Sequence, residues 1–268
     1  MRLLFLIAMF AVLPVLRLSQ TKHSRISTNQ QLIIAIKRND LGTVRALLNK
    51  GANPNTHQEC LWTKIPRNKL STEIRSWKRR TGDHPPSALM IALGIWARDD
   101  PQYDKSNGFY ASNALIKALI KAGANVNEAD IEQGDTPLMF AVRRKDTFVA
   151  EMLLSSGAHL NAQDKKGLTA LAFAVFDPDY DQSKMVEFLL KRGADPNGAS
   201  TNQGLPLVLV RGPGSLKCVH LMVNYGADIN ATDAHGKSVL ARIKEDQKGF
   251  FPASPDVVDL LCKLGSRE

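Results

Sequence analysis

The side chains that most often perform catalysis are scattered through this sequence. Six histidines are present, and no two lie three or four residues apart, the spacing that places two ligands on one face of a helix. The chain contains no Gly-x-Ser-x-Gly motif, no phosphate-binding loop and no His-Glu-x-x-His motif. Asp177, Asp179 and Asp181 have the spacing of a calcium loop but lack its glycine and its distal glutamate. We therefore predict a protein that is not an enzyme and that holds no metal or cofactor.

The cysteines predict no disulfide framework, since only three occur in 268 residues. Cys218 and Cys262 fall in apolar helical segments, where a cysteine usually serves as a small core residue. Cys60 lies in a basic segment, and we expect it to be exposed there.

That basic segment, residues 56–84, carries the side chains best suited to binding. Seven Lys and Arg residues lie between Lys64 and Asp83, opposed by two acidic residues, and two of the three tryptophans lie in the same segment. We consider two interpretations, which are compatible: the apolar residues cover the neighbouring helices, or the segment is a basic and aromatic binding arm. The candidate contact residues are Trp62, Lys64, Arg67, Lys69, Arg75, Trp77, Lys78, Arg79 and Arg80.

The whole chain is also basic, and its N-terminus is apolar. The net charge of +9 favours acidic partners. Arg2 precedes an apolar run at residues 3–16, which is shorter than the roughly 20 residues of a membrane span. We predict a signal peptide over residues 1–20, with an uncertain cleavage site, and an exported protein, periplasmic if the source is bacterial. A short uncleaved anchor or a buried first helix is the alternative.

The remaining chain repeats one phrase, a Leu-rich helix end followed by Gly-Ala-x-x-Asn. Its glycines are spaced by 72, 34, 36, 33 and 39 residues, which indicates a period close to 33. A second phrase lies between them, as in Gly134-Asp135-Thr136-Pro137-Leu138 and Gly167-Leu168-Thr169-Ala170-Leu171. Thr136 and Pro137 suit the start of a helix, and Gly157 suits a left-handed residue that ends one.

These phrases resemble the ankyrin repeat over residues 29–266. The resemblance implies an all-α solenoid of about six helix-turn-helix units with β-turn fingers, in which residues 56–84 form an insertion between units 1 and 2. Shorter insertions at residues 97–110, 177–182 and 244–254 fall between the two helices of a unit. Arg242 occupies a position that is usually apolar.

The resemblance also implies where a partner binds, because ankyrin proteins usually use finger tips and the exposed face of the first helices. Lys165 and Lys166 have a second interpretation, as a solvated turn. The residues carried over to these positions are Glu132, Gln133, Asp135, Arg143, Arg144, Lys165, Lys166, Leu168, Phe176, Gln203, His235 and Lys237.

We expect a non-catalytic protein-binding module that is monomeric when unbound. By its architecture the chain resembles exported bacterial ankyrin proteins, notably the immunity proteins of type VI secretion lipase effectors. That resemblance implies binding and occlusion of a secreted toxin with an acidic surface, with no nucleic acid and only peripheral membrane contact. The alternatives are a periplasmic ankyrin protein of stress defence or envelope assembly, and a protein that binds anionic lipid through the basic insertion.

Overall fold

The computed structural model describes residues 27–57, 86–94, 111–176, 181–198, 206–210, 214–232, 235–245 and 255–267. The predicted signal peptide and nearly all of the basic insertion lie outside these residues, and so does Gln203. Among the described residues no helix is long and apolar enough to cross a membrane.

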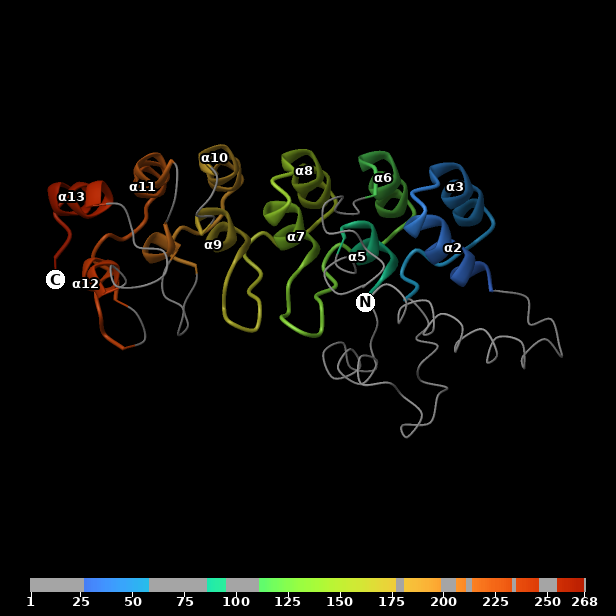
Figure 1. Ribbon diagram of the computed structural model, residues 1–268, viewed down its shortest axis with the longest axis horizontal. Coiled ribbons are helices and arrows are strands. Elements are labelled where there is room, and N and C mark those ends of the chain that lie inside the picture. The colour runs from blue at the N-terminus through green and yellow to red at the C-terminus, as the bar shows by residue number, and fades with distance from the viewer. Residues whose placement is uncertain are drawn as a thin grey trace, which may run out of the picture.

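The described chain forms pairs of short helices that stack in one direction (Figure 1). In chain order the pairs are α2 (Thr28–Lys37) with α3 (Leu41–Asn49), α5 (Ala88–Ala92) with α6 (Asn113–Lys121), α7 (Pro137–Arg143) with α8 (Thr147–Ser155), α9 (Ala170–Val175) with α10 (Ser183–Lys191), the 3-10 helix η5 (Pro206–Leu209) with α11 (Ser215–Asn224), and α12 (Val239–Glu245) with α13 (Pro255–Lys263). We number these pairs as units 1 to 6.

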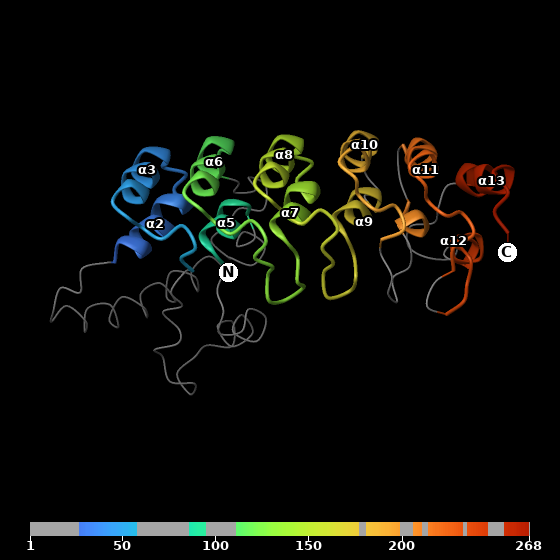
Figure 2. The ribbon, with the colours of Figure 1, turned by 180° about the vertical axis from the view of Figure 1, so that it is seen from behind.

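Two parallel rows of helices result, and they are visible from both sides of the molecule (Figures 1 and 2). The first helices, α2, α5, α7, α9, η5 and α12, form one row, and the second helices form the other. Loops that precede α7 and α9 project from the first-helix row, away from the second-helix row, as the predicted fingers do. The predicted all-α ankyrin solenoid is therefore confirmed, whereas the precise bounds 29–266 stay a prediction.

The starts of the helices follow from their sequences. The Thr136 hydroxyl accepts a hydrogen bond from the Met139 amide at 3.4 Å, and Pro137 occupies the first turn, where its missing N–H leaves no bond unmade. Asp146 caps α8 by accepting from the Val149 amide at 2.9 Å.

The second helices end at glycines with a left-handed backbone. Gly157 has φ +88°, and the next amide, of Ala158, donates to the carbonyl of Leu153. No heavy atom of the described residues beyond its chain neighbours lies within 4 Å of a Cβ built on Gly157, so glycine is needed there for its backbone and not for space.

The core is one continuous apolar layer between the two rows. Leu32 in α2, Leu153 in α8 and Leu261 in α13 are all fully buried and belong to the same cluster. Leu154 is only partly buried and packs against this cluster, so Leu153 is the core leucine of α8.

Hydrogen bonds of asparagine side chains link each unit to the next. Asn127 donates to the carbonyl of Gly157 at 2.9 Å and accepts from the amide of His159 at 2.7 Å. Asn55 and Asn197 make the same pair of bonds to the units that follow them. The asparagine of the Gly-Ala-x-x-Asn phrase is therefore a connector between units.

One expectation on the helices needs correction, and one unusual position has an explanation. Cys218 is buried as predicted, but Cys262 is exposed, because the buried positions of α13 are Val257 and Leu261 and one further residue turns the side chain outward. Arg242 is accommodated at its usually apolar position by partial burial and by an ion pair with Glu245 at 3.6 Å.

Candidate protein-binding site

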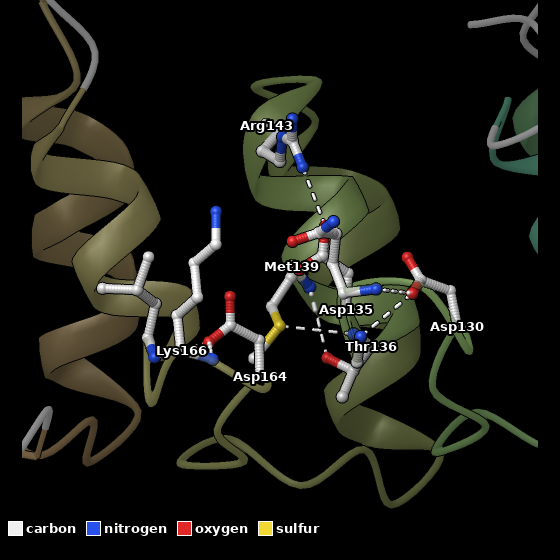
Figure 3. Close-up of polar contacts among 10 residues, drawn as sticks. Asp130, Asp135, Thr136, Met139, Arg143, Asp164 and Lys166 are labelled. Atoms are coloured by element: carbon white, nitrogen blue, oxygen red, sulfur yellow. Dashed lines mark hydrogen bonds and ion pairs between the residues drawn. The ribbon is translucent and has the colours of Figure 1, made fainter. Parts of the chain in front are cut away.

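The finger before α7 is held by one carboxylate. Asp130 accepts hydrogen bonds from the amides of Gln133 and Gly134 at 2.6 and 2.9 Å, which closes the turn (Figure 3). Asp164 does the same in the next finger, where it accepts from Lys166 and Leu168 at 2.8 and 2.7 Å. Each finger is therefore a preformed loop.

Lys165 fastens these two fingers to each other. Its amide donates to the carbonyl of Gln133 at 2.8 Å, and its ammonium group donates to the carbonyl of Ile131. Gly134 permits this approach, since a Cβ there would lie 3.0 Å from the Lys165 nitrogen. Lys165 thus links two neighbouring fingers, a structural role that the sequence alone does not indicate.

Arg143, at the end of α7, is fixed by an ion pair with a buried carboxylate. Its Nη1 lies 2.8 Å from Oδ2 of Asp135 (Figure 3), and the Asp135 side chain is only 2% exposed. Asp135 is therefore not at a finger tip, and the prediction of an exposed contact residue is wrong for it. Burial of a carboxylate is tolerable here because the guanidinium offsets the lost hydration.

Two phenylalanines support the other side of the guanidinium. The Arg143 Cζ lies 5.9 Å from the ring centre of Phe140 and 5.4 Å from that of Phe173, within the range of cation–π attraction. Phe173 belongs to α9, so Arg143 spans units 3 and 4. Sequence reasoning missed both phenylalanines, although they recur at equivalent places in the two Gly-x-Thr phrases.

Phe176 occupies in unit 4 the position that Arg143 occupies in unit 3. It follows Phe173 by three residues, the spacing of neighbours on one helical face, and it is 50% exposed. A half-exposed aromatic ring in unit 4 and a fixed arginine at the equivalent position of unit 3 have the composition of an interface hot spot. We call Arg143, Phe140, Phe173 and Phe176 the Arg–Phe cluster.

A second ion pair occupies the same places in unit 6. Lys237 contacts Glu245, and these residues follow Gly236 at the intervals by which Asp135 and Arg143 follow Gly134. The order of charges is reversed, and in unit 4 the equivalent residues are Leu168 and Phe176. In units 3, 4 and 6 this pair of positions therefore carries different side chains.

The other predicted contact residues form no single cluster. Arg144 lies 3.8 Å from Asp146 and is 10% exposed, so it is poorly placed for a partner. Glu132, Lys166 and His235 are exposed, and Leu168 is partly exposed. Trp62, Trp77 and the basic residues of the insertion lie outside the described residues.

The side chains gathered at this site suit contact with a partner. Within the described ranges no group of three or more His, Cys, Asp or Glu side chains is arranged to hold a metal ion. The Arg–Phe cluster offers apolar area and the remaining guanidinium donors, which suit a protein surface.

Comparison with known proteins agrees with this geometry. Residues 108–200 match the family model of ankyrin repeats, described as three copies. The chain is 35% identical over 204 residues to the mouse "Ankyrin repeat and SOCS box protein 6", which covers 71% of this chain and 46% of the relative. It thus spans less than half of that relative's length.

More distant relatives share the repeats in other contexts. Human "Neurogenic locus notch homolog protein 2" is 32% identical over 153 residues, which is 57% of this chain and 6% of the relative. The fowlpox virus "Putative ankyrin repeat protein FPV031" is 26% identical over 206 residues, which is 75% of this chain and 49% of the relative. Ankyrin repeats are generally non-catalytic and bind other proteins. The chain therefore contains ankyrin repeats and is homologous to ankyrin repeat proteins.

Proposed function

We propose that this chain holds a partner protein against the fingers and first helices of units 3 and 4, with the Arg–Phe cluster at the centre of the contact. The observation that carries the proposal is Phe176, which is half exposed in unit 4 at the position equivalent to Arg143 of unit 3, an arginine already fixed by Asp135 and two rings. Because these groups are ordered before binding, little side-chain entropy is lost when a partner covers them.

The charges at this site favour an apolar contact over a purely electrostatic one. Arg143 is paired with Asp135, and Lys165 binds a neighbouring carbonyl, so neither cation is free to attract an acidic surface at full strength. We expect the partner to place an apolar side chain on Phe176 and a hydrogen-bond acceptor on Arg143. Binding at this site should therefore depend only weakly on salt.

A capture experiment with a matched pair of variants tests this proposal. Phe176→Asp places a charge in the Arg–Phe cluster, whereas Phe148→Asp makes the same change at a phenylalanine that is 54% exposed on α8, in the second-helix row. We expect the protein that the wild type retains at stoichiometric amounts to be lost with Phe176→Asp and kept with Phe148→Asp. Equal retention, or equal loss in two folded variants, would refute the assignment.

The narrower role of an exported immunity protein is a further proposal. Its support is the apolar N-terminal run and the repeat architecture in the sequence, while the relatives named above come from animals and a virus. Its test is direct: the captured partner would be a secreted toxin such as a lipase, and adding this chain would suppress its activity. If the captured partner has no such activity, the immunity role is refuted and the proposed binding function still stands.

A further inference from the structure

A group of four cations lies on the second-helix row, away from the Arg–Phe cluster. Arg45 in α3, Lys50 just after α3, and Lys117 and Lys121 in α6 are all exposed. The two helices pack against each other and are neighbours in both views (Figures 1 and 2). We call these residues the α3–α6 cationic face.

The repeat geometry sets the spacing of this face. Arg45 and Lys117 each lie six residues before the glycine that ends their unit, Gly51 and Gly123. Equivalent positions on packed helices are separated by about the 8–10 Å between helix axes. The face is therefore a regular array of positive charges.

None of these four charged groups has an acidic partner among the described residues. The helices themselves contain no Asp or Glu. The nearby Asp40 caps α3 through Thr43, and hydrogen bonding to Thr43 lowers the pKa of its carboxyl. Glu151, at the equivalent position in α8, is bound to Arg192, whose hydrogen bond lowers the Glu151 pKa.

The next units show the contrasting arrangement. In α10, Lys191 pairs with Glu187 at 2.6 Å, and Arg192 pairs with Glu151 across to α8. Two cations at the end of α10 in unit 4 are thus paired with carboxylates, whereas the four cations of units 1 and 2 are not paired among the described residues. This difference needs an explanation beyond the solubility of a helical surface.

Helix stability explains the presence of only two of the four cations of the α3–α6 cationic face. Lys50 and Lys121 lie at the carboxyl ends of their helices, where a cation interacts favourably with the helix dipole. Arg45 and Lys117 lie in the middle of their helices, where the interaction with the helix dipole is weak. The two positive charges also repel each other. These two residues therefore have no stabilising role that their surroundings reveal.

Small side chains separate the cations and leave them accessible. Gly42, Ala46, Ala114 and Ala122 are exposed on the same two helices. A partner backbone can approach this surface closely, and the long Arg and Lys side chains can then reach its acidic groups. Among the described residues of α3 and α6, no aromatic or large aliphatic side chain is exposed to insert into a lipid layer.

We propose that the α3–α6 cationic face binds an acidic polypeptide segment of a partner protein, at a surface separate from the Arg–Phe cluster. Carboxylates spaced about 10 Å apart on one side of a segment, as at positions i and i+7 of a helix, match the array. Binding at this face depends steeply on salt. It speeds the first encounter with the partner.

The experiment compares two double variants of the full chain that lose the same net charge. Arg45→Gln with Lys117→Gln removes the central cations of the face. Lys184→Gln with Lys217→Gln removes two exposed cations of α10 and α11, both of which interact electrostatically with Asp181. The probe is a fluorescein-labelled peptide of eight glutamates, with a peptide of eight glutamines as the uncharged control, measured by anisotropy at low salt.

We expect the Arg45/Lys117 variant to bind the glutamate peptide about tenfold more weakly than the wild type, and the Lys184/Lys217 variant to change by less than about threefold. The melting temperature of the Arg45/Lys117 variant should stay the same or rise, because a repulsion is removed, whereas a structural role predicts a fall. Equal weakening in both variants would mean that only the net charge of the chain affects binding, and this would overturn the proposal. No weakening, or preference for phosphatidylserine vesicles over the peptide, would also overturn it.

Discussion

Replacing Asn127 by alanine is the sharpest test of how the units are joined. The Asn127 side chain makes two hydrogen bonds to the next unit, one as a donor to the Gly157 carbonyl and one as an acceptor from the His159 amide. Asn161 is the natural comparison, because its side chain accepts one such bond, from the Asp195 amide at 3.0 Å. The two variants remove the same group from equivalent positions and differ in the number of bonds lost.

The expected loss follows from the worth of one such bond. A hydrogen bond contributes about 0.5–1.5 kcal/mol net, and these bonds lie near solvent, which favours the lower half of that range. We therefore expect Asn127→Ala to lower the free energy of unfolding by about 1–2 kcal/mol and Asn161→Ala by about half as much. The loss acts on the interface between neighbouring units, which a solenoid needs in order to unfold as one body.

Urea unfolding followed by circular dichroism at 222 nm measures both changes. The midpoint should fall in the order wild type, Asn161→Ala, Asn127→Ala, and the transition of Asn127→Ala should broaden as the units uncouple. Equal losses in the two variants would refute the reasoning, because the number of inter-unit bonds would then have no effect. A loss for Asn127→Ala below about 0.5 kcal/mol would mean that water replaces both bonds.

Three further predictions concern packing, backbone and thiols. Leu153→Ala should lower the free energy of unfolding by about 2–5 kcal/mol, because Leu153 is fully buried. Leu154→Ala should lower it by clearly less, because Leu154 is only partly buried. Equal urea midpoints for the two variants would contradict the assigned helix face. Gly157→Ala should cost about 1–2 kcal/mol through its φ of +88° alone, and thermal melts that match the wild type would refute this. Burial raises the pKa of the Cys218 thiol to about 11, whereas Cys262 is exposed. In the native protein at pH 8 a maleimide should therefore label Cys262 and leave Cys218 unmodified until urea is added. Mass spectrometry of the peptides measures the order of labelling, and the opposite order would contradict the prediction.

Local sequence signals predicted the local structure well. The Thr136-Pro137 start and the Gly157 stop are readable because capping and left-handed backbone depend on neighbouring residues only. The period of the Gly-Ala-x-x-Asn phrase likewise predicted the stacking of helix pairs.

The candidate site was less predictable, because its contacts join residues that are distant in sequence. Lys165 reads as an exposed turn residue, and only the neighbouring finger, 34 residues earlier, gives it a partner at Ile131. Asp135 reads as a finger residue until Arg143 folds back onto it. The Arg–Phe cluster depends on Phe173 of another unit, and no pattern within one repeat reveals that contact.

The 3-10 helix η5 has a mechanical consequence. It is four residues long, shorter than any other first helix in the described chain, and it alone lies between α9 and α12 in the first-helix row. Its i to i+3 hydrogen bonds have poorer geometry than those of an α-helix, so this layer resists deformation least. A load applied to the two ends of the solenoid would therefore concentrate its strain at unit 5. Units 1 to 4 would then move as one stiff part and unit 6 as another, with the bending concentrated at unit 5.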